Sequence, residues 1–154
     1  MSVAPATSAV VAGQAGAEPA VALRDVRFAY RAGVDVLRVE HVLITGHYGC
    51  GGVRASLDDR RYGLIDNWLR HVQDVAQQHD AELAMLAGDA RVDRLCELNV
   101  AEQVLNTARS TVVQDAWERG QTLTVHAWIY RLDDGIIRDL GFDIESAAEL
   151  STAI

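Results

Sequence analysis

The residues of this chain best suited to chemistry lie in one short stretch, His41–Gly52, which reads HVLITGHYGCGG. Within it, His47 and Cys50 are three residues apart. An imidazole nitrogen and a thiolate sulfur are both good zinc ligands, and the H-x-x-C spacing lets one loop present both to a single ion. The spacing alone has low specificity, because two such residues often occur three apart without binding metal. The stretch is therefore a candidate for half of a metal site.

The glycines of this stretch do not indicate a phosphate-binding loop. They lack the Gly-Lys-Ser/Thr ending of a P-loop and do not match G-x-G-x-x-G. Glycine adopts positive φ at little cost, so four glycines within seven residues favour a tight turn around a ligand. The apolar residues 41–45 before the turn predict a buried strand that ends there.

The composition narrows the class of protein. The chain has 154 residues, of which 49% are hydrophobic and 23% charged, as in an ordinary globular domain with a real core. Its net charge of −8 argues against nucleic acid or an anionic membrane as the main partner. Two cysteines, no visible signal peptide and no apolar run of membrane-spanning length lead us to expect a cytoplasmic protein.

The hydrophobic periodicity predicts helices and strands in alternation. The expected helices cover residues 25–38, 64–78, 92–108 and 110–120. The expected strands cover residues 42–45, 122–130 and 136–140. The dipeptide Asp134-Gly135 is a strong signal for a hairpin turn between the last two strands. This order predicts an α/β fold with a mainly parallel sheet flanked by helices and one antiparallel return strand.

Three side chains inside these helices have expected structural roles. Ser110 is expected to cap the N-terminus of the short helix that ends near Gly120. Trp68 is expected in the core, because it belongs to the apolar stripe of the helix over 64–78. Cys96 is expected to be a small buried hydrophobic residue rather than a metal ligand.

Several longer segments together resemble the β-class carbonic anhydrases. They read VDVLRVEHVLITGHYGCGGVRA, GLIDNWLRHV, LCELNVAEQV and HAWIY followed closely by DDG, and they lie in the family's order. The resemblance covers about residues 25–140. It implies a β-carbonic anhydrase-like α/β domain over 25–142. The composition of residues 1–24, rich in Ala, Val, Gly and Ser without a period, predicts a disordered or poorly ordered tail before it. The weak helical pattern after Phe142 predicts a frayed tail at 143–154.

The resemblance also implies a ligand set, of which this sequence has only a part. In that family zinc is held by the histidine and cysteine of H-x-x-C, which match His47 and Cys50, and by the cysteine of a C-x-D-x-R motif whose aspartate can fill the fourth position. No C-x-D-x-R occurs in this sequence. Tyr130 resembles a tyrosine that binds inhibitory bicarbonate in some members. We therefore expect an N-terminally truncated member with an incomplete zinc site and an incomplete bicarbonate site.

Three functions remain open at this point. The family activity is the zinc-dependent, reversible hydration of carbon dioxide to bicarbonate, and the first hypothesis is a chain in which that activity is weak or lost. The second is a non-catalytic assembly module that pairs with a complete carbonic anhydrase paralogue. The third is an active enzyme whose zinc ligands are completed by a neighbouring chain, which requires a homo-oligomer or another partner chain.

Overall fold

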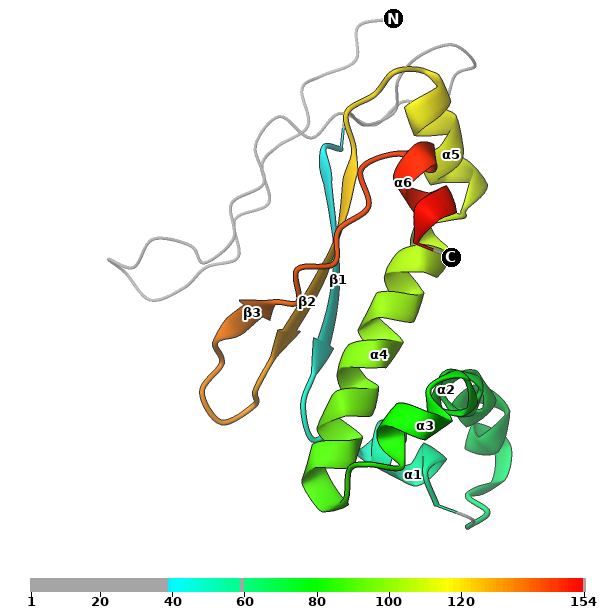
Figure 1. Cartoon of the computed structure of the whole chain (residues 1–154), viewed down its shortest axis with the longest axis vertical. Helices are drawn as coiled ribbons and strands as arrows, with labels where there is room; N and C mark the ends of the chain where they lie inside the picture. The colour runs from blue at the N-terminus through cyan, green and yellow to red at the C-terminus, as the bar shows by residue number, and fades with distance from the viewer. Residues whose placement is uncertain (1–38, 59, 154) are drawn as a thin grey trace, which may run out of the picture. The chain divides into compact units, whose positions relative to one another are not determined.

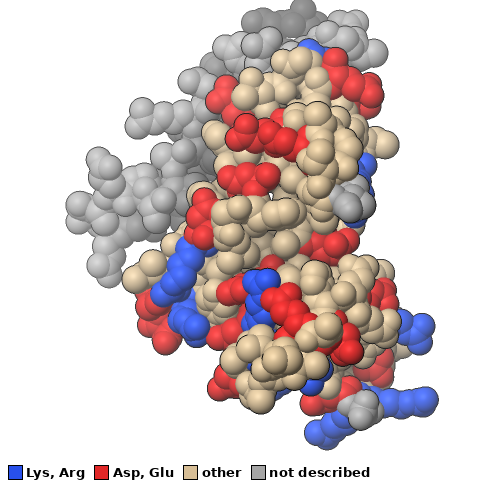
Figure 2. Space-filling model, viewed as in Figure 1, with Lys and Arg blue, Asp and Glu red and all other residues tan. Residues whose placement is uncertain are grey.

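The structure is a computed structural model that describes residues 39–58 and 60–153 (Figure 1). The tail expected at 1–24 and the helix expected over 25–38 lie outside the described residues. None of the described helices is long and apolar enough to cross a membrane. Asp and Glu side chains occur along the whole face shown in Figure 2, with Arg side chains among them, in keeping with the negative net charge.

The sheet contains the parallel pair and the return strand that the sequence predicted. Strand β1 (His41–His47) pairs in parallel with β2 (Thr124–Tyr130) over its full length. Strand β3 (Ile137–Asp139) pairs with β2 in the antiparallel direction. The turn between them lies at Asp134-Gly135, where the Asp134 carboxylate accepts the N–H of Ile136 at 2.8 Å and Gly135 has a φ of 64°. The expected fold class is confirmed.

The helices also follow the expected order. In the described residues they are α1 (Gly51–Ser56), the 3-10 turn η1 (Gly63–Ile65), α2 (Asp66–Gln78), α3 (Asp80–Leu83), α4 (Gly88–Ala108), α5 (Thr111–Glu118) and α6 (Ala147–Thr152). The side chain of Ser110 accepts the N–H of Val113, so the predicted N-cap is confirmed. Gly120, with a φ of 73°, follows α5 as predicted.

The core lies between the sheet and α4, which packs against both parallel strands (Figure 1). Val125, Ala127 and Ile129 of β2 are fully buried on the face toward the helices. Successive strand side chains point to opposite faces. The alternate residues His126, Trp128 and Tyr130 therefore share the other face of the sheet, and all three are half-buried.

Trp68 is not in the core, contrary to the prediction. Its exposed fraction is 77%, and the nearby Leu64 is 91% exposed. Helix α2 buries Leu69 and Val75 instead. The apolar side chains of residues 64–78 cover a wider part of the helix surface than the neighbouring elements do. Leu69 and Val75 therefore face the core, whereas Leu64 and Trp68 face away from it. Periodicity identifies an apolar face but does not show what covers it.

The segment after Phe142 packs on the core, whereas we expected it to be frayed. Ile144 forms an antiparallel bridge with Val125 through backbone hydrogen bonds of 2.9 and 3.0 Å. Ser146 then caps α6 by accepting the N–H of Glu149. The apolar signal of this segment is weak because it depends on few side chains, but Ile144 and Leu150 are both buried.

The close approach of β1 and α4 gives a test of the fold. A Cβ placed at Gly46 would overlap the Cγ2 methyl of Val100. We predict that Gly46→Ala lowers the free energy of unfolding by about 1–3 kcal/mol, the usual cost of overpacking a core. Urea denaturation followed by circular dichroism measures it. Gly51→Ala is the control, because a Cβ there meets nothing within 4 Å.

A double-mutant cycle identifies the overlap as the cause. Val100→Ala should cost less stability in the Gly46→Ala background than in the original chain, because it removes the methyl that the new Cβ meets. Equal costs in the two backgrounds would show that the strand and helix do not approach here as described.

Candidate functional site

The residues predicted to bind zinc lie where β1 ends. His47 is the last residue of β1, and Cys50 immediately precedes α1. Between them Gly49 has a φ of 66°, a conformation that favours glycine and turns the chain toward α1. Tyr130 ends β2 and lies opposite His47 in the parallel register, with ring centroids 6.0 Å apart. The fold thus brings Tyr130 beside His47 at the carboxyl ends of two parallel strands.

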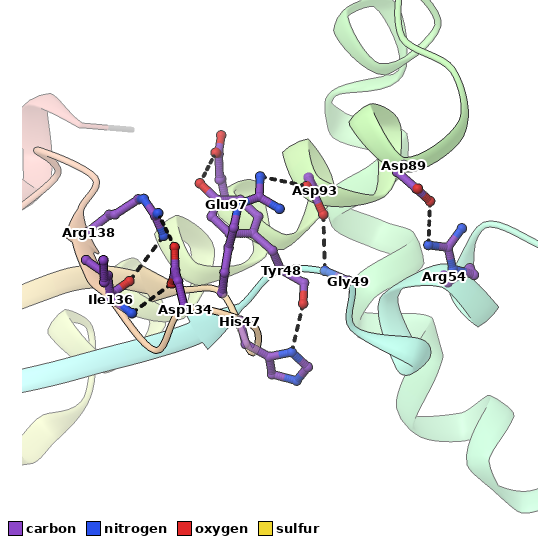
Figure 3. Close-up of polar contacts among 11 residues, drawn as sticks. His47, Tyr48, Gly49, Arg54, Asp89, Asp93, Glu97, Asp134, Ile136 and Arg138 are labelled. Atoms are coloured by element: carbon purple, nitrogen blue, oxygen red, sulfur yellow. Dashed lines mark hydrogen bonds and ion pairs between the residues drawn. The ribbon is translucent and has the colours of Figure 1, made fainter.

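The orientation of the His47 ring is set by the backbone. Its Nδ1 lies 3.0 Å from the carbonyl oxygen of Tyr48 (Figure 3). A carbonyl oxygen only accepts, so in this contact Nδ1 carries the hydrogen and Nε2 keeps its lone pair. A second hydrogen bond of this kind is how proteins commonly fix the tautomer of a metal-binding histidine. The His47 ring is half-buried, and so is Cys50.

Three acidic residues of α4, one on each successive turn, hold the loop and the start of α1 (Figure 3). Asp93 accepts the Gly49 N–H at 3.1 Å with one carboxylate oxygen. Glu97 accepts the Tyr48 hydroxyl at 2.6 Å. Asp89 pairs with Arg54 of α1 at 2.7 Å. The loop that carries both candidate ligands is therefore anchored by polar contacts to the longest helix.

Arg131 joins this network from the strand side. Its guanidinium lies 4.4 Å from the centre of the Tyr48 ring and 3.2 Å from the second carboxylate oxygen of Asp93. Burial, followed by the hydrogen bond to Glu97, raises the pKa of Tyr48 to about 12. The Tyr48 hydroxyl therefore remains protonated at neutral pH and keeps donating to Glu97.

Cys96 is a small buried side chain, as the sequence predicted. It is buried against the same core cluster that Cys50 partly joins. Burial raises the pKa of its thiol to about 11, although a hydrogen bond with the Cys50 backbone acts in the opposite direction.

The described residues fit half of a zinc site. Within residues 39–58 and 60–153, no group of three or more His, Cys, Asp or Glu side chains is placed to hold a metal ion. His47 and Cys50 are suitable donors presented by one anchored loop. A catalytic zinc site normally has three protein ligands, so the pair alone does not complete one.

The anchoring residues were not identified from the sequence. Asp93 and Glu97 are four apart and so share one helix face with Asp89, a pattern that a search for i, i+4 acids would have found. That pattern does not indicate which segment the acids contact, because Gly49 lies far from them in the sequence. No sequence signal pointed to Arg131.

A family profile and a similar protein both point to the carbonic anhydrases. The carbonic anhydrase family profile matches residues 11–137. A carbonic anhydrase of Emericella nidulans is 40% identical over 111 residues, which are 71% of this chain and 49% of the relative.

Solved structures agree with this result. The β-carbonic anhydrase of Coccomyxa, solved with acetazolamide, superposes with a TM-score of 0.71 at 35% identity, covering 77% of this chain and 54% of the other. A tetrameric β-carbonic anhydrase of Sordaria macrospora gives a TM-score of 0.63 at 31% identity, covering 69% and 54%. This chain spans about half the length of the relatives it matches.

The contact between Asp93 and Gly49 predicts how firmly the loop is held. We expect Asp93→Ala to raise the hydrogen-exchange rate of the Gly49 amide and the reaction rate of the Cys50 thiol with a disulfide reagent, each by about tenfold. That factor corresponds to the roughly 1.4 kcal/mol expected for one charge-assisted hydrogen bond.

The matched control is Asp89→Ala, one turn earlier on α4, which removes an ion pair but leaves the Gly49 amide bonded. It should change both rates much less. If the two variants had equal effects, Asp93 would have no special role in holding the loop.

Proposed function

This chain belongs to the β-class carbonic anhydrase family, and from that premise we propose that it carries half of a zinc-dependent site for the reversible hydration of carbon dioxide to bicarbonate. The observation that carries the proposal is the placement of His47 and Cys50 in one anchored loop at the carboxyl end of β1, where the contact of the His47 Nδ1 with the Tyr48 carbonyl leaves the lone pair on Nε2. We propose further that the chain alone has weak activity or none.

The incomplete set of donors supports the second part of this proposal. The printed sequence has no C-x-D-x-R motif and no cysteine before Cys50. A zinc ion would be held here by the His47 Nε2 and the Cys50 sulfur, with its remaining positions open. Two donors neither fix the geometry of an ion nor exclude competing metals. We therefore derive no catalytic step through zinc for this chain.

The chain's own residues have separate roles in the proposed site. The Tyr48 carbonyl orients the His47 ring, while Asp93 and Glu97 hold the loop against α4. We propose that Tyr130, beside His47, offers its hydroxyl to a bicarbonate ion near the strand ends. Bicarbonate carries oxygens that accept hydrogen bonds, and the Tyr130 hydroxyl is a suitable donor.

The catalytic proposal predicts near-background activity. In stopped-flow hydration assays with added zinc, we expect the purified chain and its His47→Ala and Cys50→Ser variants to give equal, low rates. After dialysis against a mild chelator, the chain should retain less than one zinc ion, because each missing ligand weakens binding. Robust hydration that disappears in both variants, together with one retained zinc, would show that another chain completes the site.

Exposed apolar side chains favour a second candidate function, an assembly module. Leu64 and Trp68 are largely exposed on neighbouring turns, and Ile65 between them is 54% exposed. Trp68 also lines a groove of about 660 Å³ between α2 and α4. Exposed apolar patches beside grooves commonly mark protein–protein contacts. The proposed partner is a second copy of this chain or a complete carbonic anhydrase paralogue.

Association through this surface is measurable by light scattering. We expect a dimer or larger species at micromolar concentration, and we expect Leu64→Gln combined with Trp68→Gln to shift it toward the monomer. Val112→Gln is the control, because Val112 is an exposed apolar residue on α5. A monodisperse monomer of the original chain, with no co-purifying paralogue, would contradict the assembly proposal.

A further inference from the structure

A small polar hollow lies where α1, α2 and α3 gather beside the start of α4 (Figure 1). Its walls come from the end of α1, the second half of α2, the first residue of α3 and the first turn of α4. Its volume is about 360 Å³, within the range of small-molecule sites. Leu57 and Ala76 are its apolar lining residues, and the other side chains that line it are polar or charged.

Arg91 supplies the positive charge of this hollow. Its Nε is buried and has no hydrogen-bond partner within residues 39–58 and 60–153. Arg94, one turn later on α4, donates instead to Glu82 and Glu97. A buried donor without a partner is uncommon and costs free energy, so the Arg91 Nε indicates an acceptor that the described residues do not supply. A carboxylate fits this position, because a guanidinium can donate two parallel hydrogen bonds to it.

Two carboxylates, those of Asp58 and Asp80, line the same hollow. Asp58 accepts the hydroxyl of Tyr62 at 2.8 Å with one oxygen, which leaves its other oxygen for a further donor. These carboxylates repel a ligand that is only negative, and the guanidinium repels one that is only positive. A ligand that carries both charges avoids both repulsions. The side-chain amides of Gln73 and Gln77, on successive turns of α2, can donate to it and accept from it.

We propose that this hollow binds a free α-amino acid with a small side chain. The carboxylate of the amino acid accepts hydrogen bonds from Arg91, and its ammonium group donates to Asp58 and Asp80. The few apolar lining residues offer contact to a small side chain only. The site is separate from the proposed zinc loop, because Cys50 precedes α1 whereas the hollow lies at the other end of that helix, about 9 Å along its axis.

The test is a titration of the isotope-labelled full chain with L-alanine, followed by nuclear magnetic resonance. We expect saturable shifts of the Arg91 Nε–H signal and of the side-chain amide signals of Gln73 and Gln77. The dissociation constant should be about 1 mM, because so small a ligand makes few contacts. Acetate and ethylamine each carry only one of the two charges, so each should bind about tenfold more weakly than L-alanine or worse.

Arg91→Gln and Asp80→Asn should each weaken L-alanine binding about tenfold. Arg70→Gln is the matched control and should bind as the original chain does, because Arg70 is exposed on α2 and outside the lining. Since Asp80 is exposed, its variant stays informative even if Arg91→Gln fails to fold. The His47→Ala/Cys50→Ser variant should also bind normally, which separates this proposal from the zinc proposal. Acetate binding as tight as that of L-alanine, unmoved Arg91 and glutamine signals, or unchanged binding in both lining variants overturns the proposal.

Discussion

The parallel pairing of β1 with β2 is the constraint on which the rest of the described fold depends. Two parallel strands cannot be joined by a tight turn and need a long crossover, and here the crossover contains α1 to α5. The close approach of Gly46 to Val100 lets α4 lie directly on the pair. This packing sets the carboxyl ends of both strands side by side and places the acids of α4 next to the loop that follows β1.

The loop itself is held by polar contacts as well as by the packing of Tyr48 and Cys50 against the core. The Tyr48 hydroxyl and the Gly49 N–H both donate hydrogen bonds to carboxylates of α4. At the start of the loop, the Tyr48 N–H donates to the Tyr130 carbonyl at 2.9 Å, which continues the pairing of β1 with β2. Each such bond contributes about 1 kcal/mol. The loop is thus built to present His47 and Cys50 in a fixed orientation, although the described residues supply no third ligand.

The sequence was sufficient for those features that depend on local pattern. Alternation in the strands, the Asp134-Gly135 turn and the Ser110 cap each reflect backbone chemistry within a few residues, and each is present. Trp68 was misplaced because an apolar stripe does not specify its partner surface. The segment around Ile144 was misjudged because its stability comes from a bridge to a distant strand. Asp93 was missed because its partner, the Gly49 amide, is a backbone group that every residue except proline has.

The two ends of the same strand pair place histidine rings in different surroundings. At the carboxyl end, an imidazole and a thiol in one loop suit zinc, and they need further donors from outside the described residues. At the other end, the ring nitrogens of His41 and His126 lie 2.9 Å apart and are hydrogen-bonded to each other. At the carboxyl end, the Tyr48 carbonyl fixes one nitrogen of the His47 ring and leaves the other for a ligand. A metal found on the unmodified chain is therefore traced to this loop by its response to substitution of His47 and Cys50, rather than by its amount.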